Sequence, residues 1–271
     1  MKSEPMNILI TNDDGIHSDG LRELVRRFGR DHRVWVAAPD TQRSAASHSV
    51  TYFRHDLFAE EIPFAHAQHA WAISGTPADC VFAALCGLMD VKPDLVISGI
   101  NDGWNVSEDC IYSGTVGAAS EGTILGIPSA AVSVASSHPS AEMLEAASAV
   151  CAELIPLFLQ DEKCMDYVLN INVPALPLEK IRGIRPARFD GRRRYGRQLD
   201  LIPEENGKLR LHCPLIDVPS DQSEIHEDGD LTLVKNGYVT LSPITLDWIR
   251  SDRLTETERM AEECTLFDVH E

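Results

Sequence analysis

The chain has 271 residues, and 44% of them are hydrophobic, which is enough for one sizeable domain with an appendage. Its formal net charge is −18, from 24 basic and 42 acidic residues, which argues against binding a nucleic-acid polymer or an anionic membrane through a basic face. No apolar run approaches the roughly 20 residues that span a membrane, and residues 1–6 lack the apolar core of a signal peptide. The seven cysteines contain no C-x-x-C pair, which favours free thiols. We therefore expect a soluble, cytoplasmic protein.

Short apolar runs alternate with helical patterns from the N-terminus to residue 173. Because strands that alternate with helices form βαβ units, this order predicts an α/β fold with a doubly wound, mostly parallel sheet. The predicted strands cover residues 7–11, 33–38, 70–74, 94–98, 127–133 and 167–173. The predicted helices cover residues 19–30, a segment that begins at Thr76, residues 113–126 and residues 141–159.

The pattern changes after Pro174. An arginine run lies at 192–194, and acidic residues are frequent from 217 to 230. Alternating apolar and polar residues at 208–212 and 231–241 predict β-hairpins, and residues 244–263 predict an amphipathic helix. We expect one domain, 1–271, in which residues 1–180 form the α/β core with the active site. Residues 181–271 would then form a hairpin and C-terminal helix appendage suited to oligomerisation.

Two adjacent carboxylates follow the first predicted strand. Asp13 and Asp14 end the apolar run at residues 8–10, and Gly15 comes directly after them. Ligands bind at the carboxyl ends of strands in open α/β sheets. Two like charges at that place are tolerable when they are solvated, or useful when a cation lies between them. The motif therefore indicates a metal site, and the alternative is a plain turn that caps a helix.

Polar groups also follow other strands of the predicted sheet, and all strand ends of a parallel sheet point the same way. Their oxygen donors suit Mg²⁺, Mn²⁺ or Ca²⁺ rather than a thiolate-binding metal. A helix that opens with Ser-Gly-Thr offers backbone N–H groups to a phosphate. A cation beside a phosphate cradle points to hydrolysis of a phosphate ester. The stretches concerned are residues 38–47, 98–105 and 112–117.

Each of these patterns also has an ordinary interpretation. Asn and Gly at 101–105 are common in loops that need left-handed backbone, and Ser113 is equally suited to capping a helix. His17 and His48 are either general acids or solvated bystanders, and we favour bystanders. Arg43 is either a phosphate clamp or a solvated loop charge.

Three other classes of protein compete with a phosphatase. A dinucleotide-dependent oxidoreductase should carry Gly-x-Gly-x-x-Gly after its first strand, where this chain has Asn-Asp-Asp-Gly-Ile-His at 12–17. A non-catalytic nucleotide sensor would share the metal and phosphate contacts, so that only turnover separates it from an enzyme. An acidic scaffold for other proteins leaves the clustered Asp, Asn and Ser residues without a purpose.

Taken in order along the chain, the motifs closely resemble those of the SurE family, the survival-protein 5′/3′-nucleotidases. A further stretch, Gly-Tyr-Val-Thr-Leu-Ser-Pro at 237–243, is similar to the family's C-terminal motif. The resemblance therefore extends over nearly the whole chain. Residues that depart from the expected pattern are Ala45 and Ser107, where glycine is more usual, and His17. The five ordered motifs lie at residues 10–15, 38–44, 74–80, 98–101 and 112–116.

The resemblance implies a Rossmann-like fold with a divalent cation at the strand ends. It implies removal of phosphate from nucleoside 5′- and 3′-monophosphates, cleavage of short polyphosphate by some members, and homodimers or homotetramers that exchange C-terminal elements. It leaves open whether a metal-activated water attacks the phosphorus or whether Asp13 forms an aspartyl-phosphate. Carried onto this sequence, the ligands of one Mn²⁺ or Mg²⁺ per subunit are Asp13, Asp14, Ser44 and Asn101; the phosphate contacts are Asn105, Ser113, Gly114 and Thr115; and the catalytic set is Asp13, Asp14 and Asn105.

Overall fold

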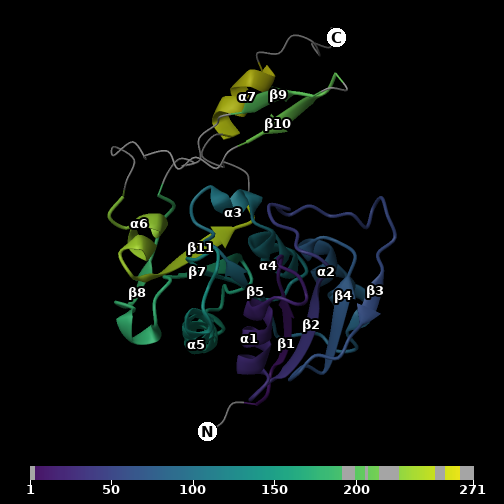
Figure 1. The fold of residues 1–271 in the computed structure, drawn as a ribbon. Helices are drawn as coiled ribbons and strands as arrows, with labels where there is room; N and C mark the ends of the chain where they lie inside the picture. Colours follow the sequence, from purple (N-terminus) through teal and green to yellow (C-terminus); the bar gives the residue numbers. More distant parts are fainter. Residues whose placement is uncertain (1–3, 191–198, 205–206, 214–225, 248–253, 263–271) are drawn as a thin grey trace.

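The computed structural model describes residues 4–190, 199–204, 207–213, 226–247 and 254–262. Within these residues the core is a nine-stranded sheet with the order β3-β4-β2-β1-β5-β6-β7-β11-β8 (Figure 1). Its six central strands run parallel, so the α/β class predicted from the sequence is confirmed. They are β4 (His69–Ile73), β2 (Arg33–Pro39), β1 (Asn7–Thr11), β5 (Leu95–Asp102), β6 (Ser129–Val134) and β7 (Tyr167–Val173).

Helices cover both faces of this sheet, as a doubly wound fold requires. Successive residues of β1 point to opposite faces, so Ile8 and Ile10 pack with α1 and α5 while Leu9 packs with α2 and α4. The N-terminus of α2 is fixed by a capping box, in which Thr76 Oγ1 accepts from the Asp79 N–H and the Asp79 carboxylate accepts from the Thr76 N–H. The four helices are α1 (Asp19–Phe28), α2 (Pro77–Ala83), α4 (Gly114–Ile124) and α5 (Ala141–Phe158).

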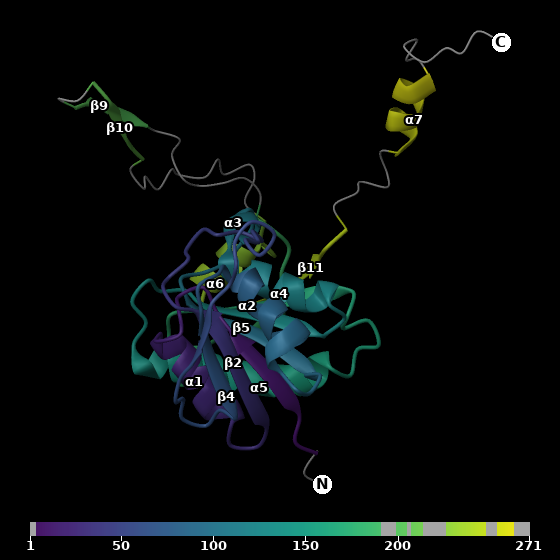
Figure 2. The same ribbon diagram turned by 90° about the vertical axis from the view of Figure 1, so that its right-hand side faces the viewer.

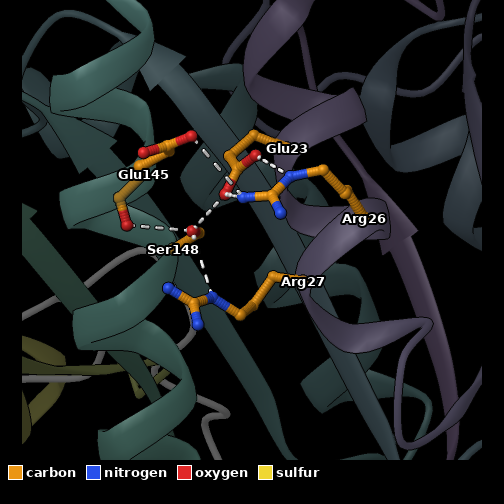
Figure 3. A network of polar contacts seen from close by, with 5 residues as sticks. All are labelled: Glu23, Arg26, Arg27, Glu145 and Ser148. Atoms are coloured by element: carbon orange, nitrogen blue, oxygen red, sulfur yellow. Dashed lines mark hydrogen bonds and ion pairs between the residues drawn. The ribbon is translucent and has the colours of Figure 1, made fainter.

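A buried polar network joins α1 to α5 (Figure 3). The Glu23 carboxylate accepts two hydrogen bonds from the Arg26 guanidinium, at 2.6 and 2.7 Å, and a third from Ser148 Oγ at 2.6 Å. Arg27 Nε donates to the same Ser148 hydroxyl at 3.4 Å. Each partner of the carboxylate carries a proton to donate, so this buried acid is fully compensated and fixes how the two helices pack.

The C-terminal third departs from the prediction in two places. Residues 231–241 were expected to form a hairpin, but they form helix α6 (Asp230–Lys235) followed by β11 (Val239–Thr245). The start of the predicted helix at 244 is also wrong, because Ile244 and Thr245 belong to β11, which pairs antiparallel with β7. A helix does occupy Leu254–Glu262, labelled α7, while 248–253 lie outside the described residues.

Two strands beyond residue 180 belong to the main sheet, namely β11 and β8 (Ile184–Pro186), so the sheet does not end at residue 180. The short strand β3 (Ala59–Glu61) pairs antiparallel with β4 and was not predicted. The predicted strand at 208–212 is confirmed, since β10 (Leu209–His212) forms a hairpin with β9 (Asp200–Pro203). Figure 2 draws this hairpin and α7 away from the α/β body. The arginine run at 192–194 and residues 217–225 of the acidic stretch lie outside the described residues.

Among the described residues, none of the helices has the length and apolar character needed to cross a membrane. The cysteines in this part of the chain are all unpaired, as the sequence predicts.

Candidate active site

Asp13 lies at the carboxyl end of β1, in contact with the N-terminal turn of α4. Only 5% of its surface is exposed, and Thr115 Oγ1 donates a 2.6 Å hydrogen bond to its Oδ1 atom. A Cβ atom on Gly114 would lie 2.8 Å from the Asp13 Cβ and 3.0 Å from its Oδ2 atom, so only glycine allows this approach. Burial, together with the neighbouring charge of Asp14, raises the pKa of Asp13 to about 6. Because Asp13 is buried, solvation does not make its charge beside Asp14 tolerable.

Asp14 accepts hydrogen bonds from the loop after β2 and from the last residue of β5. Gln42 Nε2 donates to its Oδ1 atom and the Asp102 N–H donates to its Oδ2 atom, each at 3.2 Å. Burial raises the pKa of Asp14 despite these two bonds. Burial and the charge of Asp14 also raise the pKa of Asp102 to about 6. Asp102 was not among the site residues predicted from the sequence, although its position directly after Asn101 was a usable signal.

Ser44 lies on the loop after β2, and Asn101 is the next-to-last residue of β5. The loop after β2 is bonded to the loop after β1, because the Arg43 N–H donates to the Asp13 carbonyl at 2.7 Å. Ser44 is the next residue and is exposed. Asn101 is half-buried, and its Nδ2 group donates to the Gly103 carbonyl at 2.7 Å, so the side-chain oxygen is the atom that would bind a cation.

Asn105 is anchored to the neighbouring strands β6 and β7. Its Nδ2 group donates to Ser133 Oγ at 2.9 Å, and its backbone carbonyl accepts from the side-chain amides of Asn170 and Asn172 at 2.8 and 2.9 Å. Its backbone N–H donates to Asn172 Oδ1 at 2.7 Å. None of the hydrogen bonds between described residues joins Asn105 to Asp13, so its place in the catalytic set stays a prediction.

Of the remaining candidate residues, those at the start of α4 contact Asp13, whereas in the described part of the chain the two histidines and the Arg43 side chain form no hydrogen bond with it. Ser113 is a true N-cap, since its Oγ atom accepts from the Val116 N–H at 3.1 Å, and the same turn presents Gly114 and Thr115 to Asp13. His17 is exposed, and His48 is bonded to Glu121 of α4 at 2.8 Å. Arg43 forms an ion pair with Asp40 at 3.3 Å and donates to the Ser74 carbonyl at 3.4 Å. The Arg43 contacts hold the loop after β2. Neither histidine forms a hydrogen bond to Asp13, Asp14 or Asp102 among the described residues.

The acidic cluster is defined here as Asp13, Asp14 and Asp102. Within the described residues no ion pair neutralises any of the three, and no group of three or more His, Cys, Asp or Glu side chains has the geometry of a metal site. The ligand set predicted from the sequence is not a group of that kind, because it combines two carboxylates with a hydroxyl and an amide. All four ligand atoms are hard oxygens, and the raised carboxyl pKa values mean that a nearby cation would stabilise the charged forms. The residues therefore fit a divalent metal ion.

The doubly wound sheet and the acidic cluster define an α/β protein whose candidate ligand site lies at the carboxyl ends of its parallel strands. The comparisons with known proteins identify its relatives. The chain belongs to the SurE family, because the family model described as "Survival protein SurE" matches residues 8–197.

Curated relatives agree with this assignment. A protein of Clostridium botulinum strain Loch Maree named "5′-nucleotidase SurE" is 37% identical over 256 residues, which cover 94% of this chain and 99% of that protein. A Heliobacterium modesticaldum protein of the same name is 40% identical and covers 89% of this chain and 87% of its own length. The crystal structure of the SurE protein from Aquifex aeolicus matches with a TM-score of 0.79 at 35% identity, over 94% of this chain and 99% of that one.

Proposed function

We propose that the chain is a divalent-metal-dependent phosphomonoesterase that releases phosphate from nucleoside 5′- and 3′-monophosphates, and also cleaves short polyphosphate. The observation that carries the proposal is the buried Asp13 carboxylate in direct contact with the N-terminal turn of α4. This arrangement brings a cation ligand and a phosphate cradle together. The curated name of the relatives, 5′-nucleotidase, supports the substrate class.

Four residues would hold one Mn²⁺ or Mg²⁺ ion per subunit. When bound, such a cation polarises a phosphoryl oxygen and lowers the pKa of a bound water. The ligands are Asp13, Asp14, Ser44 and Asn101.

The chain's own groups orient the reaction around that ion. Thr115 Oγ1 fixes one oxygen of Asp13, which leaves the other for ligation. The helix N-terminus at Ser113, Gly114 and Thr115 stabilises the negative charge that builds on the phosphoryl oxygens. Asn105 is the third polar group of the catalytic set and binds the phosphate from the side of β6 and β7.

The nucleophile is a water molecule in this proposal, and Asp13 is the alternative. Attack by Asp13 would form an aspartyl-phosphate, with the nucleoside hydroxyl leaving, and water would then release the phosphate. Rapid quenching of the enzyme with ³²P-labelled substrate distinguishes the two routes. Acid-stable label on the protein that is absent from Asp13→Asn would overturn the water mechanism.

Oligomerisation through the C-terminal third and a cytoplasmic location complete the proposal. The β9–β10 hairpin exposes Leu201, Leu209 and Leu211 at 55–61% of their surface, which supports an interface between copies of the chain. Light scattering after size-exclusion chromatography should give a homodimer or a homotetramer. A monomer at micromolar concentration would contradict this part of the proposal.

Phosphate release from a panel of nucleoside 5′- and 3′-monophosphates and tripolyphosphate tests the activity. Release should vanish in EDTA and return with Mn²⁺ or Mg²⁺. No release with any metal, combined with retained nucleotide binding, would overturn the phosphatase and favour the nucleotide sensor.

A further inference from the structure

A cavity of about 240 Å³ lies beside the N-terminus of α4, between α4, the short helix α3 (Asp109–Tyr112) and the end of β11. Figure 1 shows these three elements next to one another, and Ile244 of β11 packs on the cluster formed by Cys110 and Val116. Most of the lining is apolar. The side chains that give it this character are Ile111, Val116, Phe189, Ile244 and Leu246.

The cavity adjoins the proposed phosphate site, because Ser113, one of the proposed phosphate contacts, is part of its wall. Ser113 lines it, and the next residue, Gly114, contacts Asp13. Ser47 also lines it and follows the proposed ligand Ser44 by three positions. The Ser47 segment is held against this wall because its N–H donates to the Tyr112 carbonyl at 2.9 Å and its Oγ donates to the Ile111 carbonyl at 2.6 Å. A molecule whose phosphate lies at the helix N-terminus therefore has an apolar hollow directly beside it.

Phe189 supplies an aromatic ring to this hollow, 40% of it exposed. Its position is fixed by the next residue, Asp190, which is buried and whose carboxylate accepts from the Thr232 N–H and hydroxyl at 2.9 and 2.6 Å. The Asp190 N–H donates to Ser107 Oγ at 2.7 Å, on the loop that carries Asn105. The backbone next to Phe189 is therefore bonded to the loop that carries Asn105.

We propose that this cavity binds the nucleoside of the substrate, with the base stacked on Phe189, so that it sets the preference for nucleotides over other phosphate esters. The inference rests on the proposed function. An uncharged, planar base fits a mostly apolar lining that includes the Phe189 ring, while the charged phosphate remains at the helix N-terminus. Phe189 is thus a specificity-determining residue rather than a catalytic one.

The test compares two substrates that differ only in the base, adenosine 5′-monophosphate and ribose 5-phosphate. Phe189→Ala should lower the ratio of their kcat/KM values about tenfold, because base–aromatic stacking is lost. Phe189→Tyr should restore the ratio. Phe53→Ala is the matched control, since Phe53 is 81% exposed and does not line the cavity. Ile111→Trp, which narrows the hollow from another wall, should lower the ratio as Phe189→Ala does.

The outcomes separate this inference from the proposed function. An unchanged ratio in both cavity variants, with phosphate release intact, overturns the nucleoside site and leaves the phosphatase standing. An unchanged ratio with an altered oligomeric state on size-exclusion chromatography would assign the cavity to a second copy of the chain instead. If the wild type hydrolyses neither substrate, the proposed function fails. In that case, calorimetry with adenosine 5′-monophosphate tests the nucleoside site independently of turnover. An equal Kd for wild type and Phe189→Ala would overturn the nucleoside site.

Discussion

Two buried carboxylates, Glu23 in α1 and Asp13 after β1, have opposite electrostatic surroundings. Burial alone would raise the pKa of Glu23, but hydrogen bonds from Arg26 and Ser148 and the charges of Arg26 and Arg27 outweigh it and lower the pKa. Burial and the charge of Asp14 raise the pKa of Asp13, and the Thr115 hydroxyl offsets only part of that shift.

The difference indicates what each acid does. Glu23 has its partners within the fold, so it contributes to the packing of α1 against α5 (Figure 3). Asp13 has no cationic partner among the described residues, so within the fold only hydrogen bonds stabilise its charged form, and a cation would have to come from outside. Buried charge that the protein leaves uncompensated marks a binding site more reliably than buried charge as such.

The largest effect should come from Asp13→Asn. Because the variant removes a proposed metal ligand and its charge from the proposed reacting centre, we expect kcat/KM for nucleoside monophosphates to fall by about 10²–10³-fold. The melting temperature in EDTA should stay the same or rise, since a neutral amide replaces an uncompensated buried carboxylate. Asp166→Asn, at an exposed carboxyl, is the control. A large drop in melting temperature would mean that Asp13 is structural.

Glu23→Ala should show the reverse pattern, with lower stability and unchanged kcat/KM. The loss should be about 2 kcal/mol in the free energy of unfolding, because Ser148 and Arg26 lose a charged acceptor. Urea titration measures it. Glu145 is 63% exposed and lies 3.9 Å from the same guanidinium, so Glu145→Ala should cost about 0.5 kcal/mol or less. Equal losses in the two variants would show that burial of Glu23 does not matter.

Gly114→Ala tests the contact between α4 and Asp13. The new methyl group would lie within 3.0 Å of Asp13, so the carboxylate must shift and kcat/KM should fall roughly tenfold. Gly87→Ala is the control, because nothing lies within 4 Å of a Cβ atom there. A kcat/KM for Gly114→Ala equal to that of the wild type would show that Gly114 is not part of the active site.

The pH dependence of stability should show the smallest effects, with opposite signs in the two regions. The pKa of Glu23 is lowered on folding, so its contribution is present above the ordinary value of 4.5 and is lost as pH falls through the folded pKa. The pKa of Asp13 is raised to about 6, so without metal it opposes folding increasingly as pH rises from 3.8 to about 6. Urea midpoints in EDTA from pH 3 to 7 measure both limbs. Glu23→Gln should reduce the loss of stability as pH falls below 4.5, and Asp13→Asn should reduce the loss of stability as pH rises from 3.8 to about 6. Parallel curves of urea midpoint against pH for the wild type and the two variants would contradict the comparison.

Much of the fold was predictable because the central strands are continuous apolar runs. The segment 7–11 could be read as a strand from Ile8 to Ile10 alone, and Pro77 and Asp79 marked the start of α2. Residues 231–241 were misread because Leu231, Thr232 and Leu233 alternate as in a strand, while Leu231 and Val234 also match the spacing of a helix. Leu231 and Val234 are three positions apart and both pack on Val106, and this contact favours the helix.

The amino-acid sequence by itself determined the α/β class, the SurE family and the polar residues at the strand ends, since all three depend on local pattern and motif order. Tertiary structure alone decided which carboxylates are compensated. Asp13 and Glu23 are both acids in chemically ordinary stretches, and their pKa values diverge because α4 brings a hydroxyl to one while α1 and α5 bring a guanidinium and a hydroxyl to the other. The cavity beside Ser113 likewise exists only once Ser47, Phe189 and Ile244, which are far apart in the chain, meet.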